Sequence, residues 1–127
     1  IKRYYRFLRK CNFSKKKSMY FSITNSVQEK YLKKLISDIS PDIIHVHGIA
    51  ADRLFAINTA LCFENIGLVV TSHGLIGLSP DWEGSNIPYD IGNRKIYEKD
   101  IYNMISGKVK SVITAVSSRI RAMIIKN

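Results

Sequence analysis

Cysteine is scarce in this sequence, and a long apolar run is missing from it. The two cysteines, Cys11 and Cys62, form no CxxC pair and no other partner pattern, so we expect small apolar side chains in a reducing compartment. No apolar stretch approaches the roughly 18 residues that a membrane-spanning helix needs. These absences argue against a disulfide scaffold and against a chain that crosses a bilayer.

Three short enzyme motifs are also missing. The sequence holds no GxSxG nucleophile elbow, no GxxxxGK[ST] phosphate loop and no GxGxxG dinucleotide fingerprint. Their absence argues against the chemistries that these motifs serve.

Acidic residues are almost missing from the first quarter of the chain. Residues 1–34 carry eleven Lys and Arg against the single acid Glu29, whereas residues 35–127 carry nine residues of each sign. The whole net charge of +10 therefore lies in the basic segment 1–34. Such a segment is either a solvated surface or a surface that attracts an anionic partner.

Apolar side chains alternate with the charges at the start of the basic segment. They are Tyr4, Tyr5, Phe7 and Leu8, beside Arg6 and Arg9. The pattern suits a helix at a membrane interface, and it would also suit stacking on nucleic-acid bases. No RNA-binding motif accompanies it, so we favour an anionic membrane over nucleic acid. A third interpretation, equally favoured, is that these side chains pack onto a part of the protein that is missing from this sequence.

From residue 25 onward, predicted helices and strands alternate. A capping-box pair, Ser26 and Glu29, predicts a helix that begins near residue 25 and ends before Pro41. Short apolar runs predict strands at 42–47, 68–72 and 111–116, and helical spacing predicts helices at 49–65 and 91–106. Ser117 or Ser118 can cap a last helix. We also expect a long loop at 73–90 and one further strand at 19–24.

Apolar strands separated by helices are typical of a parallel sheet that helices cover on both faces. With right-handed crossovers, the predicted fold class is α/β, a Rossmann-like doubly wound parallel sheet. The length fits a single α/β domain over residues 1–127. Three or four strands are few for such a sheet, so we expect part of a larger fold.

Polar residues and glycines follow all three predicted strands. They are His47-Gly48, Ser72-His73-Gly74 and Ser117-Ser118. In an open parallel sheet, ligands bind beyond the carboxyl ends of the strands. Glycine there lets the backbone approach a ligand, and hydroxyls and helix N-termini can donate hydrogen bonds to an anion or a sugar. The repetition predicts a binding crevice at one edge of the sheet.

The three histidines admit different roles. His45 and His47 are two residues apart on one strand, so their side chains point to the same side of the sheet. With His73 they could bind zinc, although no Asp or Glu ligand follows the second or third strand. For His45 we favour hydrogen-bonded packing, and for His47 packing and crevice lining are equally favoured. His73 is the best candidate for catalysis, because an imidazole there can accept a proton from a substrate hydroxyl near neutral pH.

The order of these motifs resembles the amino-terminal domain of glycosyltransferase family 4, which has the GT-B fold. The matching pieces are PDIIHVHG, LVVTSHGL, a helix with Tyr97-Glu98, and SVITAVSSRIRAMI, from about Leu35 to the end of the chain. The resemblance implies a partial amino-terminal domain on the acceptor side of a cleft between two domains. It also implies transfer of a sugar from a nucleotide sugar to a hydroxyl.

The resemblance implies roles for single residues as well. His73 matches a histidine that lines the cleft near the acceptor and the reacting sugar, and we expect it to be catalytic. Ser117 matches a serine near the domain junction. Together with His47, Gly48 and Gly74, it would bind the acceptor. No metal and no cofactor is implied, because the nucleotide sugar acts as a co-substrate.

Two departures from the family pattern stand out. The family's glycine-rich turn, which approaches the donor, has no match in this sequence. The carboxy-terminal domain, with its Glu-x7-Glu signature, is absent, and in the family that domain mainly holds the nucleotide sugar. These departures imply a fragment that is inactive alone.

The leading hypothesis is therefore the acceptor-side domain of a retaining glycosyltransferase in polysaccharide or glycolipid synthesis. Its partner would be a sugar or a lipid-linked sugar. We expect a cytoplasmic location, peripheral at the inner face of the membrane through residues 1–34, and no nucleic-acid partner. One alternative is a zinc-dependent hydrolase that uses His45, His47 and His73. The other is a basic binding module without enzyme activity.

Overall fold

The computed structural model describes residues 1–73 and 94–126. Along the chain its elements are helix α1 (Lys2–Lys10), α2 (Lys15–Ile39), strand β1 (Ile43–His47), the 3-10 turn η1 (Ala51–Arg53), α3 (Leu54–Leu61), β2 (Gly67–Ser72), α4 (Arg94–Ser106), β3 (Ser111–Ala115) and α5 (Ser118–Lys126). The three predicted strands and the helices between and after them are thereby confirmed. Apart from His73, the loop expected at 73–90 lies outside the described residues.

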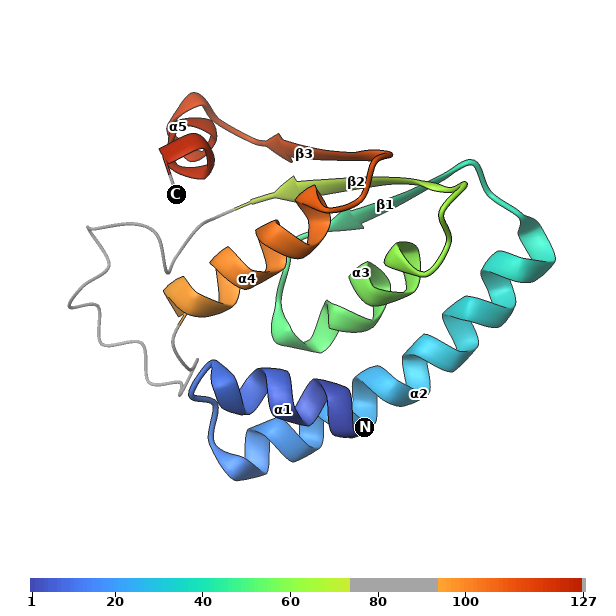
Figure 1. The fold of residues 1–127 in the computed structure, drawn as a ribbon, viewed down its shortest axis with the longest axis vertical. Coiled ribbons are helices and arrows are strands. Elements are labelled where there is room, and N and C mark those ends of the chain that lie inside the picture. The colour runs from blue at the N-terminus through green and yellow to red at the C-terminus, as the bar shows by residue number, and fades with distance from the viewer. Residues whose placement is uncertain (74–93, 127) are drawn as a thin grey trace.

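The three strands form one parallel sheet in the order β1-β2-β3 (Figure 1). In the register of this sheet, His47 lies beside Thr71, and Thr71 lies beside Thr114. A parallel sheet with helical crossovers confirms the predicted fold class, a Rossmann-like α/β domain.

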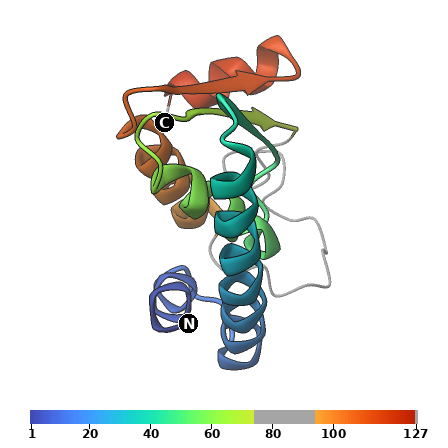
Figure 2. The same cartoon turned by 90° about the vertical axis from the view of Figure 1, so that its right-hand side faces the viewer.

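The two crossover helices, α3 and α4, lie on the same face of the sheet in both views (Figures 1 and 2). This follows from the strand order: right-handed crossovers that always step in one direction put every connecting helix on one side. The other face exposes Ile43 and Val112. Contrary to the expectation, these two helices therefore do not cover both faces of the sheet. The reason is that β1, β2 and β3 are added in the same direction across the sheet.

The hydrophobic core lies between the sheet and these helices. Val46, Leu68 and Val70 point from the sheet into the core and are almost fully buried, while the residues between them point to the open face. Leu54 and Ile57 from α3 and Ile101 and Ile105 from α4 are also buried there. Burial of each such side chain contributes roughly 1.5–3 kcal/mol to folding before entropy is counted.

Helix α2 differs from the prediction in its first half. Residues 19–24 are helical, so the further strand expected there is wrong. Ser26 is an interior residue of the helix and donates from its Oγ to the Ser22 carbonyl, so the predicted capping box is wrong too. The helix is capped by Ser14, whose Oγ accepts from the Lys17 N–H at 3.3 Å. Ser40 ends it with a left-handed φ of 52°, just before Pro41.

Helix α1 packs against α2 and contributes apolar side chains to the core. Tyr4 and Leu8 of α1, and Cys11 and Phe13 after it, are buried. Burial also raises the pKa of the Cys11 thiol to about 11. The prediction that the apolar residues of α1 enter a membrane is therefore wrong for Tyr4 and Leu8, which already pack within the chain.

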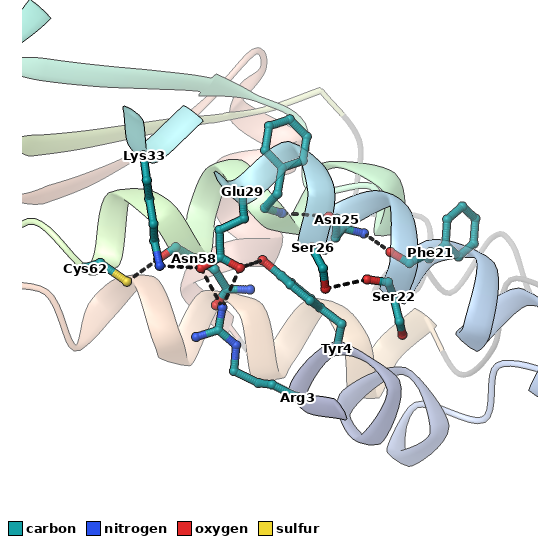
Figure 3. Close-up of polar contacts among 11 residues, drawn as sticks. Arg3, Tyr4, Phe21, Ser22, Asn25, Ser26, Glu29, Lys33, Asn58 and Cys62 are labelled. Carbon is teal, nitrogen blue, oxygen red and sulfur yellow. Dashed lines mark hydrogen bonds and ion pairs between the residues drawn. The ribbon is translucent and has the colours of Figure 1, made fainter. Parts of the chain in front are cut away.

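A polar cluster joins α1 to α2 (Figure 3). The Glu29 carboxylate accepts from Arg3 at 3.0 Å and from the Tyr4 hydroxyl at 2.7 Å, and it pairs with Lys33 at 2.7 Å. Partial burial alone would raise the pKa of Glu29, but the hydrogen bonds from Lys33 and Tyr4 and the charge of Arg3 outweigh it and lower the pKa. The one acid of the basic segment is thus used inside the fold.

Candidate functional site

The carboxyl ends of the three strands meet at one edge of the sheet. His47 is the last residue of β1, His73 follows the last residue of β2, and Ser117 comes two residues after β3. Because all three strands are parallel and paired in register, these residues share the same edge. The predicted placement of the three strand ends is confirmed.

Three imidazole rings form a row on the open face of the sheet. The ring centroids of His45 and His47 are 4.1 Å apart, and those of His47 and His73 are 5.5 Å apart. His47 Nδ1 lies 3.1 Å from His73 Nε2, a hydrogen-bond distance. Because a hydrogen bond needs one donor and one acceptor, the two nitrogens share a single proton. The pair thus fixes complementary tautomers on His47 and His73.

Two threonines extend the row of polar groups across the sheet. Thr71 Oγ1 lies 2.7 Å from His45 Nε2 and 2.8 Å from Thr114 Oγ1, so one hydroxyl links all three strands. The hydrogen bond predicted for His45 is present, but the ring lies on the exposed face and not in the core. Thr71 and Thr114 were not predicted. Their signal in the sequence is the strand period, which places Thr71 on the same face as the histidines.

The turn after β1 depends on Gly48. Its φ of 77° is left-handed, a conformation that costs a residue with a Cβ atom about 1–2 kcal/mol. The Gly48 N–H donates to the Thr71 carbonyl at 2.9 Å, and Arg53 Nη1 donates to the His47 carbonyl at 2.9 Å. These bonds hold the backbone of β1 at the point where His47 leaves the sheet. Arg53 is a further residue near the site that was not predicted.

Two serines near this edge have structural bonds. Ser117 Oγ accepts from the Ile120 N–H at 3.2 Å, so Ser117 and not Ser118 caps α5. Ser72 points to the opposite side of the sheet, where it is buried and its Oγ accepts from the Tyr102 hydroxyl at 2.9 Å. Gly74, the remaining predicted site residue, lies outside the described residues.

The histidines are arranged in a row and do not surround one point. Within residues 1–73 and 94–126, no group of three or more His, Cys, Asp or Glu side chains is placed to hold a metal ion. His45 is bonded to Thr71, and His47 and His73 are bonded to each other. This arrangement gives no support to the three-histidine zinc site.

Comparison with known families agrees with the geometry. The family model described as Glycosyltransferase Family 4 matches residues 3–127. The chain belongs to glycosyltransferase family 4. No curated protein and no solved structure matches it.

Membership in the family accounts for the fold that carries the candidate site. The parallel sheet is that of a partial Rossmann-like domain of the GT-B fold, and the family supports glycosyltransferase activity in general terms. The hypotheses of a zinc hydrolase and of a binding module without enzyme activity are therefore not favoured. In the part of the chain that the structure describes, no helix is long and apolar enough to cross a membrane.

Proposed function

We propose that this glycosyltransferase domain binds the acceptor of a reaction that moves a sugar from a nucleotide sugar to a hydroxyl. The acceptor is a sugar or a lipid-linked sugar in polysaccharide or glycolipid synthesis. The observation that carries the proposal is the His47–His73 pair at the shared carboxyl edge of a parallel sheet, where ligands of such sheets bind. As the family resemblance implies, a second domain would mainly hold the nucleotide sugar.

His73 is the catalytic residue in this proposal. In the proposed tautomer, His73 Nε2–H donates to His47 Nδ1, so that His73 Nδ1 carries no proton. This Nδ1 then accepts the proton of the acceptor hydroxyl as that oxygen attacks the sugar. The bond between the sugar and the nucleotide breaks, and the nucleotide leaves with the electron pair of that bond. His47 holds the tautomer of His73 through the shared proton. No cofactor is needed beyond the nucleotide sugar as co-substrate.

Gly48 and Ser117 lie at this edge and serve as acceptor contacts in the proposal. Gly74, which lies outside the described residues, is a third acceptor contact that only the family resemblance implies. The left-handed turn at Gly48 favours glycine and leaves this backbone free of a side chain. Ser117 caps α5, so its position places a helix N-terminus, with its backbone N–H groups, beside the crevice. Most of the rate acceleration would come from positioning and electrostatics supplied by such groups.

The protein works at the cytoplasmic face of a membrane in this proposal. The excess of ten positive charges in residues 1–34 supports attraction to anionic lipid, and a lipid-linked acceptor would be presented there. No nucleic acid takes part.

Histidine substitutions in an enzyme that carries both domains test the proposal. His73→Ala should lower turnover about tenfold or more, which corresponds to at least about 1.4 kcal/mol in the barrier. His47→Ala should lower turnover less and shift the pH dependence of kcat, because it acts through the tautomer of His73. The free energy of unfolding should change little for both, since the rings are exposed.

His45→Ala is the matched control. Its ring is in the same row but bonds Thr71, so turnover should stay within about twofold of the parent enzyme. Unchanged turnover in His73→Ala would remove this residue from the site. Equal losses in the His45 and His73 variants would show that the row supports the sheet and not the chemistry.

A further inference from the structure

Helix α2 exposes an apolar surface along its outer side. Tyr20, Ile23, Val27 and Tyr31 follow one another at intervals of three and four residues, so they lie on one side of the helix. Their side chains are 64%, 47%, 50% and 74% exposed, respectively. We call these four residues the apolar stripe. Four large apolar side chains in line on a solvent-facing helix indicate a surface that meets another apolar phase.

The inward side of the same half of α2 is polar. Ser18, Ser22 and Asn25 are fully buried. Asn25 donates to the carbonyls of Phe21 and Ala51 at 2.7 and 2.8 Å and accepts from the Phe55 N–H at 2.7 Å. These bonds fix the rotation of α2 about its axis, because turning the helix to bury the stripe would break them. The exposure of the stripe is therefore built into the fold.

Lysines accompany the stripe on the same side of the helix. Lys16 lies one turn before Tyr20, and Lys30 and Lys34 lie one and two turns after Val27, and all three are exposed. Glu29 is turned to the other side and is paired with Arg3 and Lys33. The outer surface of α2 from Lys16 to Lys34 thus combines apolar and positively charged side chains.

The stripe continues into an open hollow beside the start of α1. The hollow has a volume of about 700 Å³, and its lining includes Ile1, Ile23, Val27 and Tyr31, with Lys30 and Lys34. Figure 2 shows that α2 runs away from the sheet and carries α1 at its far end. A second hollow, beside His45 and His47, is bordered by Gln28 and Leu32 of α2 and shares no lining residue with the first, so the apolar stripe lies on a different side of α2 from the histidines.

We propose that the apolar stripe and Lys16, Lys30 and Lys34 form a docking surface for an anionic lipid bilayer. The stripe enters the boundary between headgroups and acyl chains, and the lysines bond the headgroup phosphates. Charge complementarity favours lipid over a second copy of the chain, which would bring lysines of the same sign together. The inference deepens the membrane contact of the proposed function and moves it from the apolar residues of α1 to α2.

Vesicle binding of the 127-residue chain tests this surface without any sugar present. The chain should co-sediment with vesicles of phosphatidylcholine and phosphatidylglycerol, and it should bind pure phosphatidylcholine at least about tenfold more weakly. Val27→Ser/Tyr31→Ser, which removes apolar area and keeps the charge, should weaken binding to the mixed vesicles about tenfold. Lys30→Gln/Lys34→Gln, which keeps the apolar area, should weaken it by about tenfold or more.

Two double variants on other elements serve as matched controls. Val109→Ser/Ile125→Ser removes exposed apolar residues elsewhere, and Lys99→Gln/Arg121→Gln removes two exposed charges elsewhere. Both should bind within about threefold of the parent chain. Circular dichroism and urea unfolding should show all four variants to be folded, because every substituted side chain is exposed.

Several results would overturn the proposal. Two of them are absence of binding to anionic vesicles and equal binding to neutral vesicles. The others are a loss of binding in the control variants as large as in the α2 variants, or a dimer of the parent chain that becomes monomeric in Val27→Ser/Tyr31→Ser. Because no sugar is present, failure here leaves the transfer reaction standing. Conversely, loss of turnover in His73→Ala with unchanged vesicle binding would show that the histidine site and the lipid-docking surface act independently.

Discussion

The sheet and helix α2 distribute apolar and polar side chains in opposite ways. In the sheet, Val46, Leu68 and Val70 face the core, and the histidines and threonines face outward. In the first half of α2, serines and an asparagine face inward, and the apolar stripe faces outward. Apolar burial stabilises the first region, whereas satisfied hydrogen bonds hold the second. The outward surfaces differ accordingly, and we propose a polar acceptor as the ligand of the first and lipid as the partner of the second.

The largest expected effect tests the polar side of this comparison. Asn25→Ala removes three hydrogen bonds and leaves the partly buried Phe55 N–H and Ala51 carbonyl without that partner. We expect a loss of about 3 kcal/mol in the free energy of unfolding, measured by urea denaturation, because each buried unsatisfied group costs roughly 1–3 kcal/mol. Asn103→Ala, exposed on α4, is the control and should cost less than about 0.5 kcal/mol. Equal stability of the two variants would mean that polar contacts do not hold α2.

The next effect tests the apolar side of the comparison. Val70→Ala and Val112→Ala are the same change on opposite faces of the sheet, at 0% and 55% exposure. Val70→Ala should cost about 2 kcal/mol, from the lost methyl groups and the cavity they leave. Val112→Ala should cost less than about 0.5 kcal/mol in the same denaturation experiment. Similar losses for both would indicate that the open face is also packed.

The smallest expected effect is a loss of unfolding free energy at acidic pH, which comes from the Glu29 contacts between α1 and α2. The pKa of Glu29 is lowered in the folded chain, so its contribution is complete above the ordinary value of 4.5 and is lost as the pH falls through the lowered pKa. Glu29→Gln should therefore flatten part of the decline in unfolding free energy below about pH 4.5. Glu64→Gln, at an exposed site, should leave that decline unchanged. A decline of the same size in all three proteins would assign the loss at acidic pH to other carboxyls.

The sheet and the placement of its strand ends were largely predictable from the sequence. Strand period and the residues after each strand were enough to place His47, His73 and Ser117 at one edge, because parallel pairing leaves few other arrangements. The hydrogen bond between His47 and His73 was not predictable. It depends on ring rotation and on the relative twist of two strands, which residue spacing does not encode.

The first part of α2 was mispredicted for a physical reason. Hydrophobic patterning assumes that apolar residues face inward, and here the inward residues are serines and Asn25. The Ser26–Glu29 pair resembled a cap because both residue types suit one. Glu29 instead binds Arg3 and Tyr4, about 25 residues away, and local sequence rules do not detect contacts over such a separation.

The order of the strands has a consequence for synthesis on the ribosome. Each strand pairs with the strand translated just before it, since the sheet order follows the chain order. The paired residues Ile43 and Gly67 are 24 positions apart, so β1, α3 and β2 can close soon after leaving the exit tunnel. β3 then adds to an edge that already exists, after the longer segment with α4 has emerged. The nascent chain can therefore fold in the direction of translation, without holding an early strand unpaired until a distant partner arrives.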